Sequence, residues 1–249
     1  MKIQKYPIFL FIVFLAVWTW AAIAPKYRDG WLAENYLVFV LVPLIVIFSI
    51  YFRLSKTSYT LLTIFAILHV IGSHYTYAET PFGYILQTWL GADRNMYDRL
   101  VHLSFGLLLA YPMREVFIRL SQAKGFWSYW FPIELVMGLS GLFEIIEWLA
   151  SIYFAPDVGL AYVGAQGDIW DAQKDMALAT IGSIFTMFVV FIINAIYNPS
   201  HSKEFKESLT IPKNDEILGE VKLSEMILQK KVKKWKKSLN THIPSKNHE

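Results

Sequence analysis

Six apolar stretches, each close to the length of a membrane-spanning helix, limit what this chain can fold into. A helix needs roughly 20 mainly apolar residues to cross the hydrocarbon core of a bilayer. Only 17% of the residues are charged, whereas a soluble domain uses about a quarter of its residues for charge. Lipid must therefore cover the apolar surface, and the pattern predicts an all-α, polytopic membrane protein with a six-helix bundle. The predicted spans are Pro7 to Ala24, Tyr36 to Phe52, Tyr59 to Ala78, Tyr97 to Leu120, Phe126 to Phe154 and Gly167 to Tyr197.

Residues 1–198 form the predicted membrane domain, and residues 199–249 form a basic cytoplasmic tail. The tail carries 11 Lys against 7 acidic residues, which makes it +4 within a chain of net charge +3. Apolar residues between Leu223 and Leu239 fall near one helical face, and six lysines lie between Lys230 and Lys237. This pattern predicts a basic amphipathic helix on the anionic inner leaflet. The alternative is a solvated, partly disordered tail.

The distribution of Lys and Arg predicts that both termini are cytoplasmic. That orientation places 18 basic residues inside and five outside, as the positive-inside rule requires. The first stretch could instead be a signal peptide, because Lys2 and Lys5 precede an apolar run that ends in Ala22-Ile23-Ala24. The segment from Glu79 to Asn95 is too short to span, and Pro81 followed by apolar residues predicts a short interfacial helix on the outer face.

Acidic and imidazole side chains gather at one end of four predicted spans. The third and fifth spans exit, and the fourth and sixth enter, on the predicted outer side. Asp98 and His102 are i,i+4 and Glu144 and Glu147 are i,i+3, so each pair shares a helix face. His69 and His74 are five apart and converge only if the helix breaks, for which Gly72-Ser73 is a plausible place, or else only one of them binds. The whole set comprises His69, His74, Asp98, Arg99, His102, Glu144, Glu147, Asp168, Asp171, Lys174 and Asp175.

A divalent metal ion accounts for this mixture. A carboxylate buried near hydrocarbon costs several kcal/mol unless it is paired or coordinated, and Arg99 and Lys174 are too few to pair all of these acids. Imidazole nitrogen and carboxylate oxygen together are ligands for Zn, Fe or Mn. The predicted metal ligands are His69, His74, Asp98, His102, Glu144, Asp168 and Asp171.

Each part of this set also has an ordinary structural explanation. Glu144 and Glu147 could be interfacial, and Asp168 could cap the sixth helix while Asp171 and Asp175 favour its positive end. Asp98 and Arg99 could form a rim ion pair, and His69 could be a satisfied buried histidine. The coincidence of four helices at one end favours a shared site. Small residues at Gly138, Gly141, Ala179, Gly182 and Ser183 predict a close approach of the fifth and sixth spans.

The leading functional hypothesis is a metal-dependent hydrolase or oxidase that acts on a lipid or a membrane-soluble substrate. Glu147 or Asp175 would be the general base, and Lys174 or Arg99 would stabilise the developing oxyanion. The alternative is a small transporter or ion-coupled permease that uses the same residues to bind a cation or protons. A non-catalytic scaffold or sensor is a third class. The absence of Cys excludes disulfides, Fe–S clusters and cysteine nucleophiles, and no feature indicates nucleic acid.

Four motifs in this order are similar to those of a known family. HVIGSHYTYAE, YDRLVHLSFG, FEIIEW and GDIWDAQKDM resemble the YjdF-like bacterial inner-membrane proteins, a family of unknown function. The resemblance covers roughly residues 1 to 197 and leaves the tail outside. It implies a multi-pass protein of the bacterial inner membrane, and it implies no substrate or mechanism.

Overall fold

The computed structural model describes residues 5–153, 166–210 and 220–241, and all regular structure in these ranges is helical. Six helices in them are long and apolar enough to span a membrane, which confirms the predicted polytopic fold. They are α1 (Lys5–Ala22), α2 (Arg28–Tyr51), α3 (Lys56–Tyr75), α5 (Tyr97–Leu120), α6 (Trp127–Tyr153) and α8 (Asp171–Tyr197). Shorter elements are η1 (Tyr77–Glu79), α4 (Pro81–Leu90), α9 (His201–Ser208) and α10 (Glu220–Thr241).

The helices agree with the predicted spans to within a few residues, except at the start of the second. The second begins at Arg28 instead of Tyr36, because the polar residue Asn35 is accommodated inside the bundle. Its side chain accepts a hydrogen bond from Trp18 Nε1 and donates to Ser73 Oγ, at 2.8 and 3.2 Å. The third helix continues without a break through Gly72-Ser73 and ends at Tyr75. The fifth predicted span is helical to Tyr153, and its last predicted residue, Phe154, lies outside the described residues.

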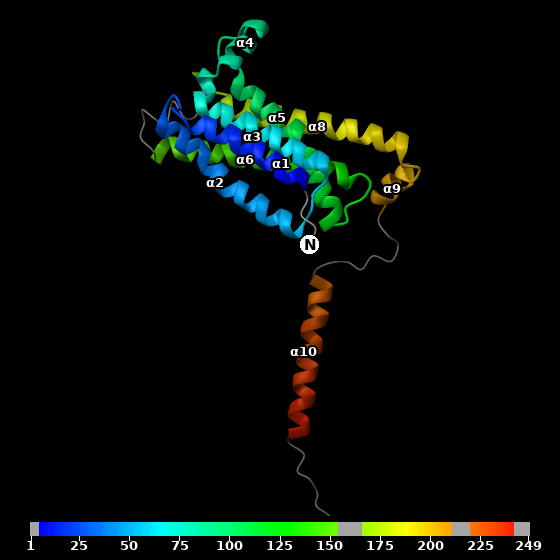
Figure 1. Ribbon diagram of the computed structural model, residues 1–249. Helices are drawn as coiled ribbons and strands as arrows, with labels where there is room; N and C mark the ends of the chain where they lie inside the picture. The colour runs from blue at the N-terminus through cyan, green and yellow to red at the C-terminus, as the bar shows by residue number, and fades with distance from the viewer. Residues whose placement is uncertain (1–4, 154–165, 211–219, 242–249) are drawn as a thin grey trace, which may run out of the picture. The chain divides into compact units, whose positions relative to one another are not determined.

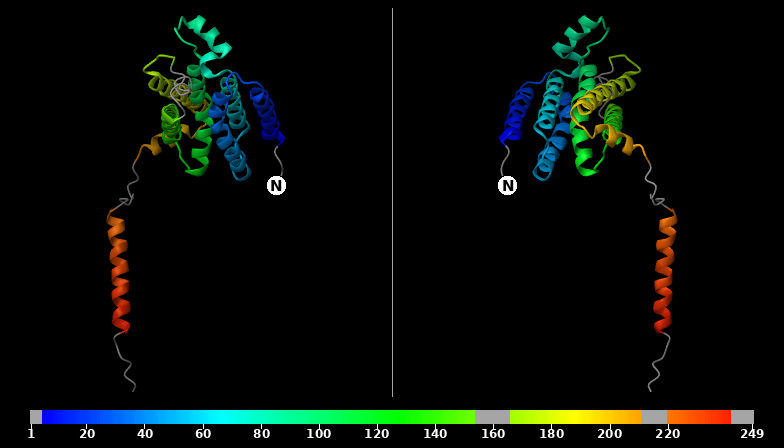
Figure 2. Two further views of the ribbon diagram at one scale, coloured as in Figure 1. Left: turned by 90° about the vertical axis from the view of Figure 1, so that its left-hand side faces the viewer. Right: turned by 90° about the vertical axis from the view of Figure 1, so that its right-hand side faces the viewer.

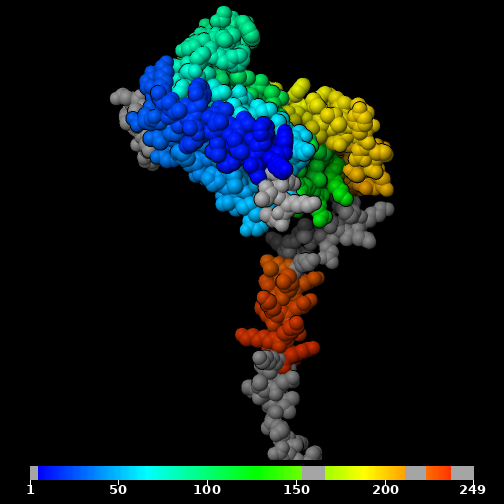
Figure 3. All heavy atoms as spheres, viewed as in Figure 1, coloured from blue at the N-terminus to red at the C-terminus, as the bar shows by residue number. Residues whose placement is uncertain are grey.

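Helix α5 is at the centre of the bundle. It contacts α3, α6 and α8, while α1 and α2 pack on α3. Figure 2 shows α1 at one edge of the bundle and α6 with α8 at the other. Helices α1 and α2 lie on the side of the bundle that faces the viewer in Figure 3. Their exposed side chains include the apolar residues Phe9, Ile12 and Leu44. Such a surface is stable in contact with lipid.

Glycines allow a close backbone approach of α5 and α8, whereas the prediction placed such an approach between the fifth and sixth spans, α6 and α8. A β-carbon at Gly106 of α5 would lie 2.6 Å from the amide nitrogen of Ser183, and one at Gly182 would lie 2.8 Å from that of Leu107. At Gly138 of α6 an added β-carbon would have no atom of the described residues within 4 Å. Glycine therefore allows backbone contact between α5 and α8, but leaves open space beside α6.

Helix α4 begins at Pro81, as the sequence predicts, and ends before Gly91, which is left-handed with φ 61°. Its Tyr84, Ile85 and Trp89 side chains are exposed, as expected of an interfacial helix. The membrane face on which it lies stays a prediction, and so does the orientation of the termini.

Residues 1–209 and 210–249 form separate compact units. The first includes α9, where Ser208 Oγ accepts a hydrogen bond from the amide of Phe126 at 2.8 Å. The second contains α10, which covers the predicted amphipathic segment and whose side chains are exposed from Leu223 to Lys236. The predicted boundary between residues 198 and 199 stays a prediction.

Candidate functional site

The predicted polar residues of α5, α6 and α8 meet at one end of the bundle. The ends of α3 and α6 and the starts of α5 and α8 lie there, beside the segment that leads into α4 (Figure 1). Their side chains are packed into the protein, since Asp98, Arg99, His102, Glu147, Asp171 and Asp175 are all buried. The i,i+3 and i,i+4 spacings turned these side chains toward a common interior, as expected.

Arg99, in the first turn of α5, binds the first turn of α8. Its Nη1 donates to the carbonyl oxygen of Asp171 at 2.9 Å and lies 2.7 Å from Asp175 Oδ2. Its Nη2 lies 2.6 Å from Asp171 Oδ1 and 3.1 Å from Asp168 Oδ2. Both terminal nitrogens are therefore engaged in holding α5 against α8. The predicted role of Arg99 at an oxyanion stays a prediction.

Arg94, just before α5, adds a second cation to this network. It pairs with Asp171 and, at 3.3 Å, with Asp98 Oδ2. Asp171 is thus shared by two guanidinium groups, which satisfies its charge within the protein. Asp171 therefore forms ion pairs in this structure, and its role as a metal ligand stays a prediction.

Asp168 and Lys174 lie at the rim of the network. Asp168 Oδ1 accepts from the amide of Trp170 at 3.0 Å, and its Oδ2 lies 2.7 Å from Lys174 Nζ. These two hydrogen bonds, that of Lys174 first, lower the pKa of Asp168 below its usual value. The Lys174 side chain is 55% exposed. Asp168 therefore organises the turn before α8, but it does not cap the helix, whose N-cap residue is Trp170.

Four side chains converge in the interior, and the arginines pair with only one oxygen each of Asp98 and Asp175. One ligand atom each from Asp98, His102 and Asp175 lies within 4.8 Å of the other two. His102 Nε2 is 3.7 Å from Asp98 Oδ1 and 3.5 Å from Glu144 Oε1. Glu144 Oε1 and Asp175 Oδ1 are buried and have no hydrogen-bond partner among the described residues. A cation or a proton is the partner that such oxygens require.

The charges in this interior do not balance. Five acidic side chains are about nine-tenths buried or more, namely Asp98, Glu144, Glu147, Asp171 and Asp175, against the two arginines 94 and 99. Glu147 lies within electrostatic range of Asp98, Glu144 and Glu34. In the fully ionised state three negative charges would lack a partner, which is unfavourable in a low-dielectric interior. Bound protons or a divalent ion would relieve this repulsion.

His69, Tyr77 and Glu34 form a polar arm beside this interior. His69 Nε2 is 3.1 Å from the carbonyl oxygen of Glu34, so this nitrogen carries the hydrogen, and Nδ1 accepts from the Tyr77 hydroxyl at 2.6 Å. Both ring nitrogens are therefore occupied. Burial, then the charges of Glu34, Tyr97, Asp98 and Glu147, raise the pKa of Tyr77 well above 10. The phenol stays protonated and remains the donor to His69.

The turn after α3 explains how Tyr77 reaches His69. Thr76 has φ 61°, which ends the helix and reverses the chain into η1. Gly72 admits the folded-back ring, because a β-carbon there would lie 2.9 Å from Tyr77. The helix break predicted as possible at Gly72-Ser73 is absent from α3, and Gly72 instead allows the Tyr77 ring to pack closely.

His74 points away from the other predicted ligands. Its Nδ1 is 3.0 Å from the carbonyl oxygen of Ala21, and its ring stacks on Trp20 at 4.5 Å. The unbroken helix α3 turns His69 and His74 to different neighbours, as their spacing of five residues requires. The structure thus brings Asp98, His102, Glu144, Glu147 and Asp175 together, keeps His69 beside them and separates His74.

Glu34, Tyr77 and Arg94 are parts of this site that sequence reasoning missed. Glu34 lies outside the second predicted span, which begins at Tyr36. Trp31, Glu34, Asn35 and Val38 are buried, and their i, i+3, i+4, i+7 spacing is a helical pattern that could have found it. Arg94 was counted only for orientation, and Tyr77 has no sequence signal beyond the polar residues around it.

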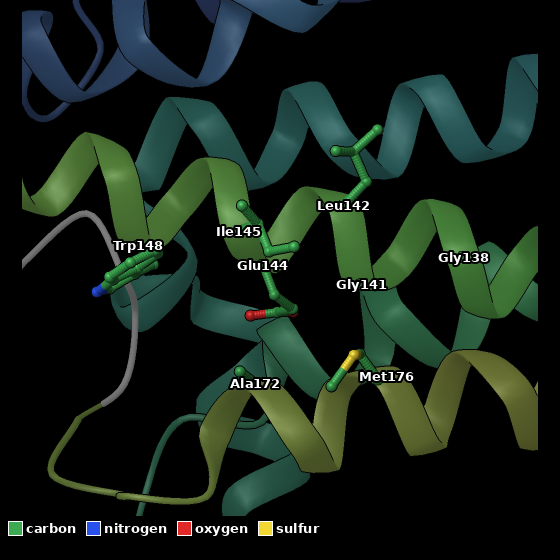
Figure 4. A pocket seen from close by; sticks show the side chains of 8 residues that line it. All are labelled: Gly138, Gly141, Leu142, Glu144, Ile145, Trp148, Ala172 and Met176. Carbon is green, nitrogen blue, oxygen red and sulfur yellow. The ribbon is translucent and has the colours of Figure 1, made fainter.

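An open groove of about 630 Å³ lies between α6 and α8. It is lined by α6 residues between Gly138 and Trp148 and by Ala172 and Met176 of α8. Glu144 is the acidic residue in this lining, and Figure 4 shows its side chain directed from α6 toward α8. Leu142, Ile145 and Trp148 are more than half exposed. The groove thus joins the apolar surface to the side chain that contacts His102.

Comparisons with known proteins agree with this membrane architecture. The inner membrane protein YjdF of Escherichia coli (strain K12) is 36% identical over 163 residues, which cover 65% of this chain and 77% of that protein. No solved structure matches the chain. The family described as "Predicted membrane protein (DUF2238)" matches residues 6–195, and the chain therefore belongs to this family of membrane proteins.

Proposed function

We propose that this protein is a metal-dependent enzyme of the bacterial inner membrane, with a substrate drawn from the lipid phase. The observation that supports it most is the convergence of Asp98, His102 and Asp175 beside the unpartnered Glu144 Oε1. The inner-membrane location is proposed from the name of the E. coli relative. The groove at Glu144 supports a membrane-soluble substrate, because its mouth lies among exposed apolar side chains.

The donor set favours a particular kind of ion. One imidazole with two or three carboxylates is rich in oxygen, which suits Mn²⁺ or Fe²⁺ better than sites rich in imidazole or thiolate do. Zn²⁺ with nitrogen and oxygen ligands is the third candidate. A divalent ion would act as a Lewis acid and lower the pKa of a bound water toward neutrality. Hydrolysis uses this chemistry directly, whereas an oxidase would need a redox-active ion.

The remaining side chains have roles that follow from their positions. Glu147 lies within electrostatic range of Asp98 and Glu144, so its carboxylate can accept a proton from a group bound at the ligands. Arg94 and Arg99 hold Asp98 and Asp175 in place through ion pairs, and such partners orient metal ligands. This assignment makes Glu147 the general base and the arginines positioning residues.

Metal analysis of the purified protein tests this proposal. Cells are grown with Mn, Fe and Zn, and the wild-type protein is purified in detergent. Inductively coupled plasma mass spectrometry is expected to find a stoichiometric amount of one of these metals in it. Loss of a ligand in His102→Ala or Asp175→Asn should weaken affinity by about 10–100-fold or more. The matched control is His201→Ala, which should retain the metal. It removes a buried histidine of α9 that is hydrogen-bonded to the hydroxyl of Tyr129.

A wild type without stoichiometric metal would refute the enzyme proposal, and metal retained by both ligand variants would refute the ligand assignment. The carrier alternative has its own measurement. Cation or proton flux into proteoliposomes that is abolished by Glu144→Gln would establish a carrier instead.

We also propose that α10 lies on the anionic inner leaflet. Each Lys near such a surface contributes about 1 kcal/mol, and Lys230, Lys231, Lys233, Lys234 and Lys236 are exposed around Trp235. Full-length protein in nanodiscs with anionic lipid should be cleaved by trypsin at these lysines about tenfold more slowly than in neutral nanodiscs. High salt should remove the difference. Equal cleavage in both lipids at low salt would mean that the tail is solvated.

A further inference from the structure

The groove between α6 and α8 differs from the other glycine-containing helix contacts of the bundle. An added β-carbon at Gly141 would lie 3.2 Å from Met176 Sδ, and at Gly138 it would meet no atom within 4 Å in the part of the chain that the structure describes. Between α5 and α8, glycine allows backbone contact. Between α6 and α8, it leaves open space. The volume of about 630 Å³ is that of a typical small-molecule site, which occupies about 300–1,000 Å³.

Glu144 is the second observation that points to a ligand. Its side chain is 10% exposed, and Oε1 is buried without a hydrogen-bond partner among the described residues. It lines the groove and lies 3.5 Å from His102 Nε2. A molecule in the groove would therefore place its polar end at the unsatisfied carboxyl and its apolar part between Leu142, Ile145 and Met176.

The charge of the interior restricts that polar end. Five buried acids against two arginines leave excess negative charge, and a divalent ion would not remove all of it. A phosphate or carboxylate beside Glu144 would add like charge in a low-dielectric setting, which is strongly unfavourable. A hydroxyl, ester or amide can donate to or accept from the site without that cost.

We propose that the groove binds one hydrocarbon chain of an uncharged membrane lipid, with a neutral hydroxyl or ester head at Glu144 and His102. The occupant comes from the bilayer, since the lining side chains Leu142, Ile145 and Trp148 are exposed on a membrane-spanning helix. This inference rests on the proposed function in naming the lipid as the substrate class, but binding itself can be measured without turnover.

Photo-crosslinking with a diazirine-bearing palmitoyl glycerol monoester tests it on the full-length protein in detergent. The label is expected on α6 peptides around residues 138–148 and on α8 around 172–176. Unlabelled palmitoyl glycerol should compete, whereas palmitoyl phosphate should compete at least about tenfold more weakly, which corresponds to about 1.4 kcal/mol. Label spread over the outward faces of α1 and α2, or equal competition by the phosphate, would overturn the proposal.

Groove-filling variants sharpen the test. Gly138→Leu should lower the labelling about tenfold, and Gly138→Ala, which adds one methyl to open space, should lower it less. Gly30→Leu is the matched control, because Gly30 is a helical glycine of α2 whose β-carbon would meet only Tyr27, at 3.7 Å. Unchanged labelling in both Gly138 variants would overturn the proposal.

Metal content, measured on the same samples, separates this inference from the proposed function. Specific labelling of a wild type without metal would support the lipid site and refute the enzyme. Metal with no specific labelling would refute the lipid site and leave the metal proposal standing. The Gly138 variants should keep their metal, since Gly138 is not among the predicted ligands.

Discussion

Replacing Arg99 by methionine is expected to lower the free energy of unfolding by about 3–5 kcal/mol. The guanidinium is 7% exposed and contacts the carboxylates of Asp168, Asp171 and Asp175. Removing the guanidinium leaves one cation fewer to balance these carboxylates, which lie near the buried Asp98 and Glu147. Because the methionine side chain is similar in length to that of arginine, the loss of stability reflects the missing charge more than a change in packing. Thermal unfolding in detergent, followed by the amount of protein that stays monodisperse, measures the change.

Two further variants separate the buried ion pairs from a general effect of losing an arginine. Arg119 is on the same helix and pairs with Glu115 at 3.0 Å, but its side chain is 42% exposed, so Arg119→Met should cost about 1 kcal/mol or less. Combining Arg99→Met with Asp175→Asn should recover part of the loss, because one unpaired charge is removed. Equal destabilisation by both arginine variants would show that the buried network is not what stabilises this end of the bundle.

Gly106→Ala is expected to destabilise the bundle by about 3 kcal/mol, at the upper end of the usual cost of overpacking. The new β-carbon would overlap the carbonyl oxygen of Ala179 and lie 2.6 Å from the amide nitrogen of Ser183. Both are backbone atoms of α8 and cannot rotate away, so α5 and α8 must separate. The same change at Gly182 should act similarly, since its β-carbon would meet the backbone of Leu103 and Leu107.

Gly138→Ala is the matched control for this prediction. It makes the same substitution in a membrane-spanning helix, at a position where no described residue has an atom within 4 Å of the added β-carbon. Alanine exceeds glycine in helix propensity by up to about 1 kcal/mol, so its melting temperature should be equal to or above that of the wild type. If Gly106→Ala and Gly138→Ala melt together, the close contact between α5 and α8 is not a determinant of stability.

Much of the architecture was predictable because the constraints that produce it are local. A run of apolar residues near 20 in length must span or be buried, whatever its neighbours are. The pairs Asp98 with His102 and Glu144 with Glu147 share helix faces by their spacing alone. Successive spans cross the membrane in alternating directions, and this alone predicted that the polar residues gather at one end of the bundle. These arguments need no knowledge of which helices are neighbours.

Which polar residues pair with one another was not predictable in the same way. Asp171 and Asp175 are four apart on one helix, yet Asp171 is shared by two arginines while Asp175 keeps a buried oxygen without a partner. Glu34 joined the site only because Asn35 is hydrogen-bonded by Trp18 and Ser73 from two other helices. Such partners are chosen by packing between helices that are distant in sequence.

The sequence by itself determined that the chain is a six-span membrane protein with an acidic and imidazole-rich cluster at one end, because length, hydropathy and helical spacing are properties of single segments. The tertiary structure alone decided which carboxylates pair with Arg94 and Arg99, and that Glu144 Oε1 and Asp175 Oδ1 have no hydrogen-bond partner among the described residues. It also decided that α5 and α8 touch through Gly106 and Gly182 while a groove opens at Gly138. The physical reason is that charge pairing and helix separation depend on distances between side chains of different helices, and no single helix encodes those distances.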